Sequence, residues 1–245
     1  TSPPSAFDGN NHLVVWSDRI DTNLDTIVDE DHIRAIRVDP NGVTLDAAPI
    51  GIAMGASLKS PPRVAFVSGY FIVVWSEALG GPNEVIRLAR VQSDGVVMDP
   101  NGLILVSSGV NESAPSITAN GQELMLIWKH DVPGNSDVHG LRLAASGAAI
   151  GTPFSISDAT GAQSLARAAC GSGMCFAAWH DDRVAGLHNT YGARIQADGT
   201  VLDPQGIEIS PPTSNDDQVE VAFDGVNFLV MWTHNESGSW DIHAA

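Results

Sequence analysis

Positive charge is scarce in this chain. Only 12 of its 245 residues are Lys or Arg, against 29 Asp and Glu, and the formal net charge at pH 7 is −17. Nucleic-acid binding depends on basic surfaces that neutralise phosphate groups, so the composition argues against a nucleic-acid partner. It predicts instead a solvated acidic surface that keeps the protein soluble and attracts cations.

Long apolar segments are also missing. No apolar run approaches the roughly 20 residues that a membrane-spanning helix needs, and no basic-then-apolar leader opens the chain. We therefore expect no membrane insertion. The chain either begins at a processed N-terminus or has its leader in a part of the polypeptide outside this sequence.

Cysteine is limited to two residues, Cys170 and Cys175. They flank the turn Gly171-Ser172-Gly173-Met174, so they face one another across a hairpin at disulfide distance. We predict a disulfide, which indicates an oxidising compartment and an extracellular or cell-surface location. A zinc site is excluded, because the spacing is wrong and no second pair completes four ligands.

What the sequence has is a repeat. Each of five tryptophans closes an apolar run: Trp16, Trp75, Trp128, Trp179 and Trp232. Trp75 follows Trp16 by 59 residues, and the later intervals are 53, 51 and 53 residues. The first and last copies read Ala-Phe-Asp-Gly and then Leu-Val-Val-Trp or Leu-Val-Met-Trp. Short β-branched and aromatic runs around a Gly-containing turn favour a hairpin over a helix.

A second hairpin follows each of the first four tryptophans. An arginine lies five residues before each of its turn glycines: Arg37 before Gly42, Arg90 before Gly95, Arg142 before Gly147 and Arg194 before Gly199. Two hairpins in a repeat of about 50 residues give four strands, which is the sheet of one propeller blade. A β-helical solenoid is the competing architecture, but its coils are shorter than this period.

We therefore predict an all-β fold, a β-propeller of four-stranded antiparallel blades. Five tryptophans imply five blades within one domain that spans residues 1–245. The expected blades cover residues 4–60, 61–113, 114–164, 165–217 and 218–245. A fifth arginine would fall just past Ala245, so we expect an incomplete last blade and a longer polypeptide.

The repeat consensus carries a family resemblance. It reads Ala-Phe-Asp-Gly, Leu-Val-Val-Trp, Asp-Ile-x-Gly-Ala-Arg-Val and Leu-Asp-Pro-x-Gly-Ile-x-Ile-Ser. It resembles the propeller-like repeats of large secreted or cell-surface bacterial proteins, most of which have no assigned function. The resemblance covers essentially the whole chain. It implies the propeller architecture and a surface or secreted location, and it implies no particular activity.

The first repeat contains an insertion. Gly42 follows Trp16 by 26 residues, whereas the corresponding interval in the next three repeats is 20, 19 and 20 residues. The inserted connection has alternating oxygen ligands like the opening of a calcium loop: Asp21, Asn23 and Asp25, with Asp29 and Asp31 just beyond. It lacks the Gly and Glu of an EF-hand, so the sequence predicts either a calcium site of another type or an ordinary acidic loop. Calcium is the only cofactor indicated.

The loop after each Trp is expected on the rim where propellers usually hold ligands. Its polar residues differ from blade to blade, and we predict the following set as ligand-binding: Asp18, Arg19, His130, His180, Asp182, Arg183 and His234. The alternative is that these residues are solvated loop tips. The repeated Trp and Arg are given structural roles, with Trp between neighbouring blades and Arg on oxygens of its own blade.

Two functional hypotheses follow. The favoured one is a secreted, non-catalytic propeller that binds a carbohydrate or protein ligand at its rim, or that serves as a module of an extracellular assembly. No catalytic residue is predicted, because the sequence has no His-Glu-x-x-His, Gly-x-Ser-x-Gly or phosphate-binding loop. The alternative is an extracellular glycan hydrolase or lyase, since five-bladed propellers include glycosidases with two convergent carboxylates.

Overall fold

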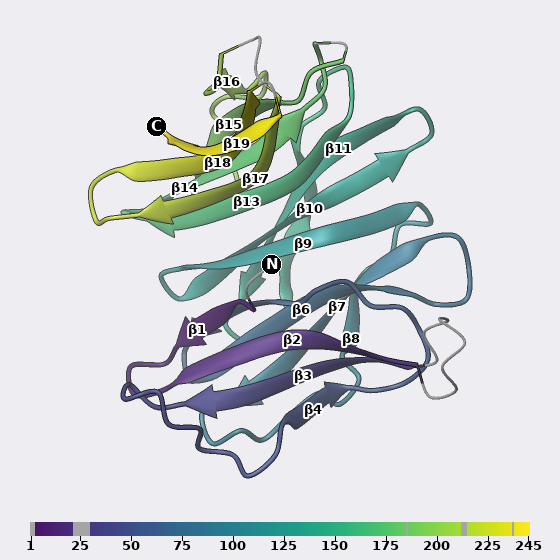
Figure 1. The fold of residues 1–245 in the computed structure, drawn as a ribbon, viewed down its shortest axis with the longest axis vertical. Coiled ribbons are helices and arrows are strands. Elements are labelled where there is room, and N and C mark those ends of the chain that lie inside the picture. Colours follow the sequence, from purple (N-terminus) through teal and green to yellow (C-terminus); the bar gives the residue numbers. More distant parts are fainter. Residues whose placement is uncertain (1–2, 22–29, 185, 212–214, 237) are drawn as a thin grey trace. The chain divides into compact units, whose positions relative to one another are not determined.

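The computed structural model describes residues 3–21, 30–184, 186–211, 215–236 and 238–245. Every regular element assigned within these ranges is a β-strand, and the strands form five antiparallel sheets in chain order (Figure 1). Four sheets have four strands and the last has three. The predicted all-β fold of antiparallel blades is confirmed. The chain divides into two compact units, one of Thr1–Pro115 with Ala145–Gly147, the other of Ser116–Ala144 with Ala148–Ala245.

The first unit holds two complete blades. The first blade contains β1 (Ser5–Phe7), β2 (His12–Ile20), β3 (Glu30–Val38) and β4 (Ile50–Ala53). The second contains β5 (Arg63–Val67), β6 (Tyr70–Ala78), β7 (Glu84–Gln92) and β8 (Leu103–Val106). Alternate residues of their middle strands are buried together, among them Leu13 with Val15 and Val73 with Trp75. Side chains alternate across a strand, so this cluster collects one face of each strand; β6 is buried on its other face as well, at Ile72 and Val74.

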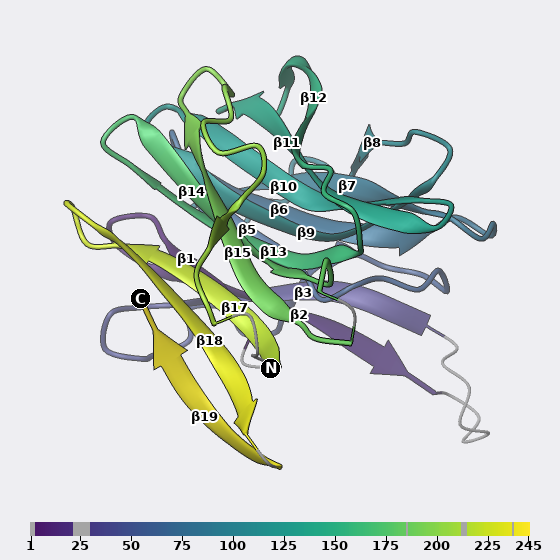
Figure 2. The same ribbon diagram turned by 90° about the horizontal axis from the view of Figure 1, so that it is seen from above.

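The second unit holds most of the third blade and the two that follow. The third blade contains β9 (Asn111–Asn120), β10 (Glu123–Val132), β11 (Asn135–Ala144) and β12 (Ala149–Ser157). The fourth contains β13 (Gln163–Gly171), β14 (Met174–Asp181), β15 (Asn189–Gln196) and β16 (Ile207–Glu208). The fifth contains β17 (Asp216–Phe223), β18 (Phe228–Glu236) and β19 (Ser239–Ala244), a sheet of three strands (Figure 2).

The repeated tryptophans anchor the blades, with one exception. Trp75, Trp128 and Trp179 are 0–1% exposed and Trp232 is 5% exposed, whereas Trp16 is only partly buried. A glycine backbone covers two of the rings, because a Cβ atom at Gly102 would lie 2.4 Å from the ring of Trp75. The corresponding distance from Gly206 to Trp179 is 3.1 Å. Close packing against a glycine therefore completes the burial of these two indoles.

The repeated arginines are structural in three blades. Each donates to the aspartate nine residues later: Arg37 to Asp46, Arg90 to Asp99 and Arg194 to Asp203. Hydrogen bonds from Arg90 lower the pKa of Asp99, and those from Arg194 lower the pKa of Asp203. In the third blade, Arg142 has no such aspartate and pairs with Glu123 at 2.8 Å.

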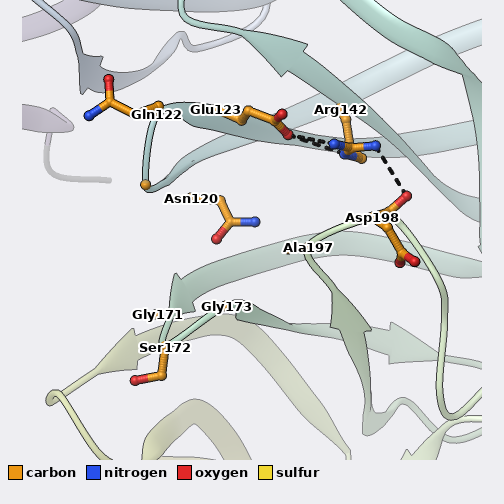
Figure 3. Close-up of a pocket in the computed structure, with 10 residues that line it drawn as sticks. Asn120, Gln122, Glu123, Arg142, Gly171, Ser172, Gly173, Ala197 and Asp198 are labelled. Carbon is orange, nitrogen blue, oxygen red and sulfur yellow. Dashed lines mark hydrogen bonds and ion pairs between the residues drawn. The ribbon is translucent and has the colours of Figure 1, made fainter.

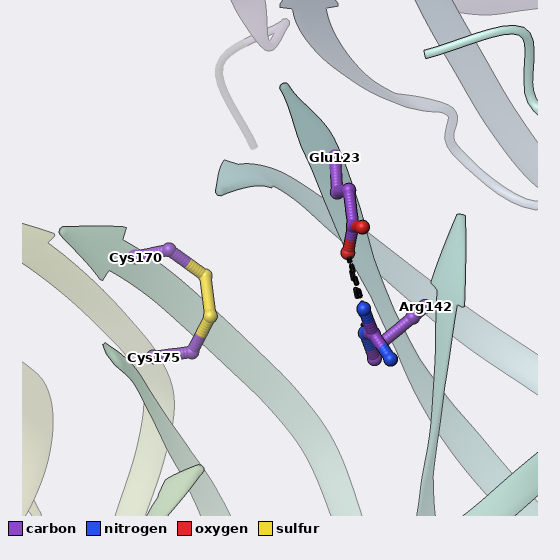
Figure 4. Close-up of a disulfide and its surroundings, with 4 residues drawn as sticks. All are labelled: Glu123, Arg142, Cys170 and Cys175. Atoms are coloured by element: carbon purple, nitrogen blue, oxygen red, sulfur yellow. Dashed lines mark hydrogen bonds and ion pairs between the residues drawn. A yellow bond between two sulfur atoms is a disulfide. The ribbon is translucent and has the colours of Figure 1, made fainter. Parts of the chain in front are cut away.

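The predicted disulfide joins Cys170 at the end of β13 to Cys175 on β14 (Figure 4). The two residues are direct partners in the antiparallel register, with their Cα atoms 4.0 Å apart. The prediction is confirmed, and the structure describes no free cysteine. Within the described ranges, no helix is long and apolar enough to cross a membrane.

Removing this disulfide is expected to weaken the fourth blade without unfolding it. Closing so short a loop restricts the unfolded chain little, so Cys170→Ser with Cys175→Ser should cost about 2 kcal/mol of unfolding free energy. Urea titration followed by circular dichroism measures the cost. The wild type under a reducing agent should match the double variant. A variant that fails to fold would contradict this assignment of a local clamp.

Candidate functional site

Buried polar residues mark the ends of the blades where their first strands begin. Sixteen residues before each of the last four tryptophans stands a polar residue that is almost fully buried: Lys59, Glu112, Gln163 and Asp216. Buried polar groups need hydrogen-bond partners, so polar side chains of neighbouring strands gather at the same ends. In the second unit, this gathering forms a cavity.

The cavity has a volume of about 380 Å³ and is called here the His180 pocket. It is lined by residues of the fourth and fifth blades: Ser164, Leu165, His180, His188, Asn215, Asp216, Asp217 and Trp240. Its size is that of a small ligand site. Histidines, carboxylates and an indole that is 55% exposed line the same space, so the pocket can offer both hydrogen bonds and an aromatic face.

Backbone bulges shape the pocket. Leu165 and Gln218 have positive φ angles of 50° and 54°, although neither is glycine. Both lie where the pairing register of the first strand shifts, between Ser164 and Arg167 in one blade and between Asp217 and Glu220 in the next. A bulge redirects the side chains beside it. Ser164 and Asp217, which line the pocket, therefore lie directly beside the two register shifts.

His180 is the most unusual group in the pocket. It is 4% exposed, and its Nε2 atom has no hydrogen-bond partner among the described residues. Its Nδ1 atom lies 4.0 Å from Asp217 Oδ1. Burial lowers the pKa of His180, and this outweighs the opposite effect of Asp217. The imidazole is therefore neutral at pH 7, and its Nε2 is a buried nitrogen without a hydrogen-bond partner.

The carboxylates around His180 differ in their surroundings. Asp216 is buried and accepts hydrogen bonds from Thr190 N at 3.1 Å and Thr190 Oγ1 at 3.0 Å, while His234 Nδ1 lies 3.0 Å from its other oxygen. The side chain of Asp217 is 45% exposed. Asp216 is thus a fixed structural acceptor, and Asp217 is the carboxylate that a ligand can reach.

A histidine–aspartate pair stands at the pocket wall. His188 Nδ1 lies 2.5 Å from Asp182 Oδ1, and His188 itself lines the pocket. The hydrogen bond to Asp182 orients the imidazole. The pair therefore places an oriented imidazole in the same pocket as the exposed Asp217.

The residues predicted to bind ligand separate into two groups. His180 lines the pocket, Asp182 reaches it through His188, and His234 holds Asp216. The others lie elsewhere: Asp18 pairs with Arg34, Arg19 with Asp31, His130 stacks on His139, and Arg183 pairs with Asp181 and lies over the ring of Tyr191.

Asp181 and Arg183 support the rim rather than the pocket. Asp181 is fully buried and accepts a hydrogen bond of 3.0 Å from Trp179 Nε1 as well as two from the guanidinium of Arg183. Arg183 also donates to Gln205 O at 2.7 Å. The two side chains therefore connect the central tryptophan of the blade to its outer turn.

The predicted calcium loop is only partly described. Asn23, Asp25 and Asp29 lie outside the described residues, and Asp21 lies at their border. Asp31 is buried and already accepts hydrogen bonds from Lys59 N and Arg19 Nε. Within the described ranges, no group of three or more His, Cys, Asp or Glu could hold a metal ion. The calcium site remains a prediction from the sequence.

Several pocket residues are absent from the predicted set: Ser164, His188, Asp216, Asp217 and Trp240. A signal for Asp216 exists in the sequence, because it stands in the same register before its Trp as Gln163, Glu112 and Lys59. For Ser164, His188, Asp217 and Trp240, nothing in the sequence distinguishes the repeat position from that of an ordinary surface residue. Their proximity depends on the pairing of β14 with β13 and β15, and of β17 with β18.

Acidification is expected to destabilise the protein through His180. Its pKa is lowered by burial from 6.5 in the unfolded chain, so its contribution to stability is present above pH 6.5 and is lost as the pH falls through the folded pKa. Urea unfolding at pH 7 and pH 5 should show a smaller pH effect for His180→Gln than for the wild type. The exposed His243→Gln variant is the control, and equal pH effects in all three proteins would contradict the assignment.

Comparisons with known proteins identify the architecture. No family model and no curated protein matches the chain. An endo-arabinase from Bacteroides thetaiotaomicron is similar over 99% of this chain and 92% of its own, with a TM-score of 0.63 and 14% identity. A thermostable family-43 glycoside hydrolase is similar over 99% and 88%, with a TM-score of 0.60 and 10% identity. The fold is thus a five-bladed β-propeller.

A third solved structure leads in the same direction. The α-L-arabinofuranosidase from Lactobacillus brevis is similar over 99% of this chain and 88% of its own, with a TM-score of 0.59 and 11% identity. The similar structures are named as glycoside hydrolases, so the prediction of a non-catalytic binding or structural module is contradicted. The alternative, a glycan hydrolase, agrees better with these comparisons. The regularity of the repeat was the reason for predicting a non-catalytic module. Regular blades can nevertheless surround a pocket whose residues differ from one blade to the next.

Proposed function

We propose that the chain is a glycan-acting hydrolase that binds its substrate in the His180 pocket. The observation that carries the proposal is Asp217, a reachable carboxylate next to a buried, neutral histidine with an unsatisfied nitrogen. The fold similarity to glycoside hydrolases supports the reaction class. The disulfide, the acidic composition and the resemblance to secreted bacterial repeats support an extracellular or cell-surface enzyme.

Hydrolysis of a glycosidic bond needs one group that activates water and one that protonates the leaving oxygen. In this pocket, Asp217 takes the proton from a water molecule that attacks the anomeric carbon. In this proposal, His188, which is oriented by its hydrogen bond to Asp182, gives a proton to the departing oxygen. Most glycosidases use a second carboxylic acid as donor, so the histidine donor is specific to this proposal.

His180 and Trp240 bind the sugar in this proposal. When the imidazole of His180 turns toward the pocket, its Nε2 gains a sugar hydroxyl as hydrogen-bond partner, and an unpartnered buried polar atom otherwise costs about 1–3 kcal/mol. Trp240 offers its exposed indole to the apolar face of a sugar ring. Three carboxylates at or beside the pocket, those of Asp182, Asp216 and Asp217, repel anionic sugars. The substrate is therefore a neutral glycan.

One carboxyl group has the raised pKa of an acid catalyst but lies elsewhere. Burial, and then the nearby charge of Asp158, raise the pKa of Asp137 on β11. A raised pKa suits a group that must donate a proton at neutral pH. Asp137 does not line the His180 pocket, so it is given no step in the reaction.

The test is hydrolysis by the purified chain. Arabinan, β-1,3-galactan and an aryl α-L-arabinofuranoside are the first substrates, since the similar structures include arabinanases, an arabinofuranosidase and an exo-β-1,3-galactanase described as putative. We expect new reducing ends to form in proportion to enzyme concentration. NMR then identifies which anomer of the product forms first. Polygalacturonate is the anionic control and should not be cleaved. A folded protein that releases no sugar from any neutral glycan would refute the proposal.

A further inference from the structure

The third blade breaks a rule that the other complete blades keep. In those blades, the aspartate nine residues after the repeated arginine accepts the backbone N–H of the arginine, at 2.8 Å for Arg37, 3.1 Å for Arg90 and 3.0 Å for Arg194. It also accepts hydrogen bonds from the guanidinium through both carboxylate oxygens. The corresponding residue of the third blade is Gly151.

Arg142 makes a poorer ion pair as a result. Its Nε and Nη2 atoms both donate to one oxygen of Glu123, Oε2, at 3.2 and 2.8 Å. Its Nη1 atom donates to Asp198 O at 3.3 Å (Figure 3). The side chain of Glu123 is 37% exposed. A guanidinium suited to two parallel bonds to a carboxylate thus contacts only one oxygen of a solvent-accessible partner.

An open space replaces the missing carboxylate. A cavity of about 340 Å³ is lined by Arg142, Gly151 and their neighbours Ile150, Thr152, Phe154, Asp198, Gly199 and Thr200. A Cβ atom added to Gly151 would meet nothing within 4 Å. A second cavity of about 620 Å³ shares Arg142 and Asp198 and extends to Asn120 (Figure 3). The two cavities together are called the Arg142 groove.

We propose that the Arg142 groove binds a carboxylate-bearing sugar, a hexuronate unit of a glycan. The carboxylate of the sugar occupies the position that the aspartate holds in the other blades. It replaces Glu123 as the partner of Arg142, and the Glu123 side chain moves into solvent. Phe154 offers a partly exposed ring to the sugar, and Thr152 offers a hydroxyl group. The carboxylate of Asp198 is tied to its own turn through Thr200 N at 2.8 Å. The planar guanidinium of Arg142, with its parallel N–H donors, favours a carboxylate over a spherical anion.

The groove is independent of the hydrolase proposal. It lies by the hairpin turn Gly171–Gly173, where β14 begins, whereas His180 stands near the other end of the same strand. The two sites also differ in chemistry, since the groove has an arginine beside the carboxylates of Glu123 and Asp198, whereas the pocket has histidines and carboxylates and no arginine in its lining. The hydrolase proposal can therefore fail while the groove still binds hexuronate, and the reverse also holds.

Matched sugars test the carboxylate. D-galacturonate and D-galactose differ only in the carboxylate at C6, so their binding is compared by NMR titration of the Asp217→Asn variant, which separates binding from turnover. We expect galacturonate to bind at least tenfold more tightly than galactose, and less tightly in 0.5 M salt. Equal affinities, or no binding of galacturonate at millimolar concentration, would overturn the proposal.

Three variants test the place of binding. Arg142→Gln should weaken galacturonate binding at least tenfold, while Arg194→Gln, at the same repeat position of the next blade, should not change it. Gly151→Asp restores the missing carboxylate and should abolish binding; aspartate tolerates the φ of +80° at this position better than most residues. If Arg142→Gln does not fold, Phe154→Ala should still weaken galacturonate but not acetate. Unchanged binding in Gly151→Asp and Phe154→Ala would overturn the proposal.

Discussion

Replacing Asp217 by Asn is expected to lower the rate of glycan hydrolysis about 10²–10⁴-fold, the usual contribution of a general base. The amide keeps the size of the side chain but cannot accept the proton of the attacking water. The side chain is 45% exposed; its carboxylate accepts the backbone N–H of Gln218 and lies 4.0 Å from His180 Nδ1. The fold should therefore survive, and initial rates on arabinan measure the effect.

Two controls separate catalysis from structure. Glu208→Gln removes an exposed carboxylate of β16 in the same unit and should leave the rate unchanged. Asp216→Asn should lower both rate and stability, because Asp216 holds Thr190 and His234. In Asp217→Ala, added azide should restore part of the rate, because a small nucleophile then needs no base. An Asp217→Asn enzyme with more than half of the wild-type rate would contradict the assigned role.

Trp179→Ala is expected to cost about 3–5 kcal/mol of unfolding free energy, the usual cost of removing a large buried aromatic side chain. Trp179 is fully buried between its strand neighbours and the backbone of Gly206. Its Nε1 atom also donates to Asp181, which would lose a buried hydrogen bond. Urea unfolding monitored by far-ultraviolet circular dichroism gives the difference.

Trp240→Ala is the matched control in the same unit. Its indole is 55% exposed on β19, so its removal should change the unfolding free energy by less than about 1 kcal/mol. It should instead raise the KM for a neutral glycan, because the aromatic face of the His180 pocket is lost. A cost below 1 kcal/mol for Trp179→Ala would contradict the view that the repeated tryptophans are structural.

The sequence by itself determined the architecture. The intervals between Trp16, Trp75, Trp128, Trp179 and Trp232, with a short apolar run before each, are enough to define strands, blades and their number. The pairing of Cys170 with Cys175 could also be predicted from the sequence, because a hairpin turn fixes which residues face each other. Such features are local, and a repeat states them several times over.

Only the tertiary structure decided which polar residues share a site. In the sequence, His180, Asp182 and Arg183 are equivalent charged residues after a tryptophan, yet one lines a pocket, one holds a histidine and one turns inward to Asp181. Asp217 joins them from another blade. Burial and pairing across blades, rather than residue type, determine whether a charged side chain is solvated or able to act on a ligand.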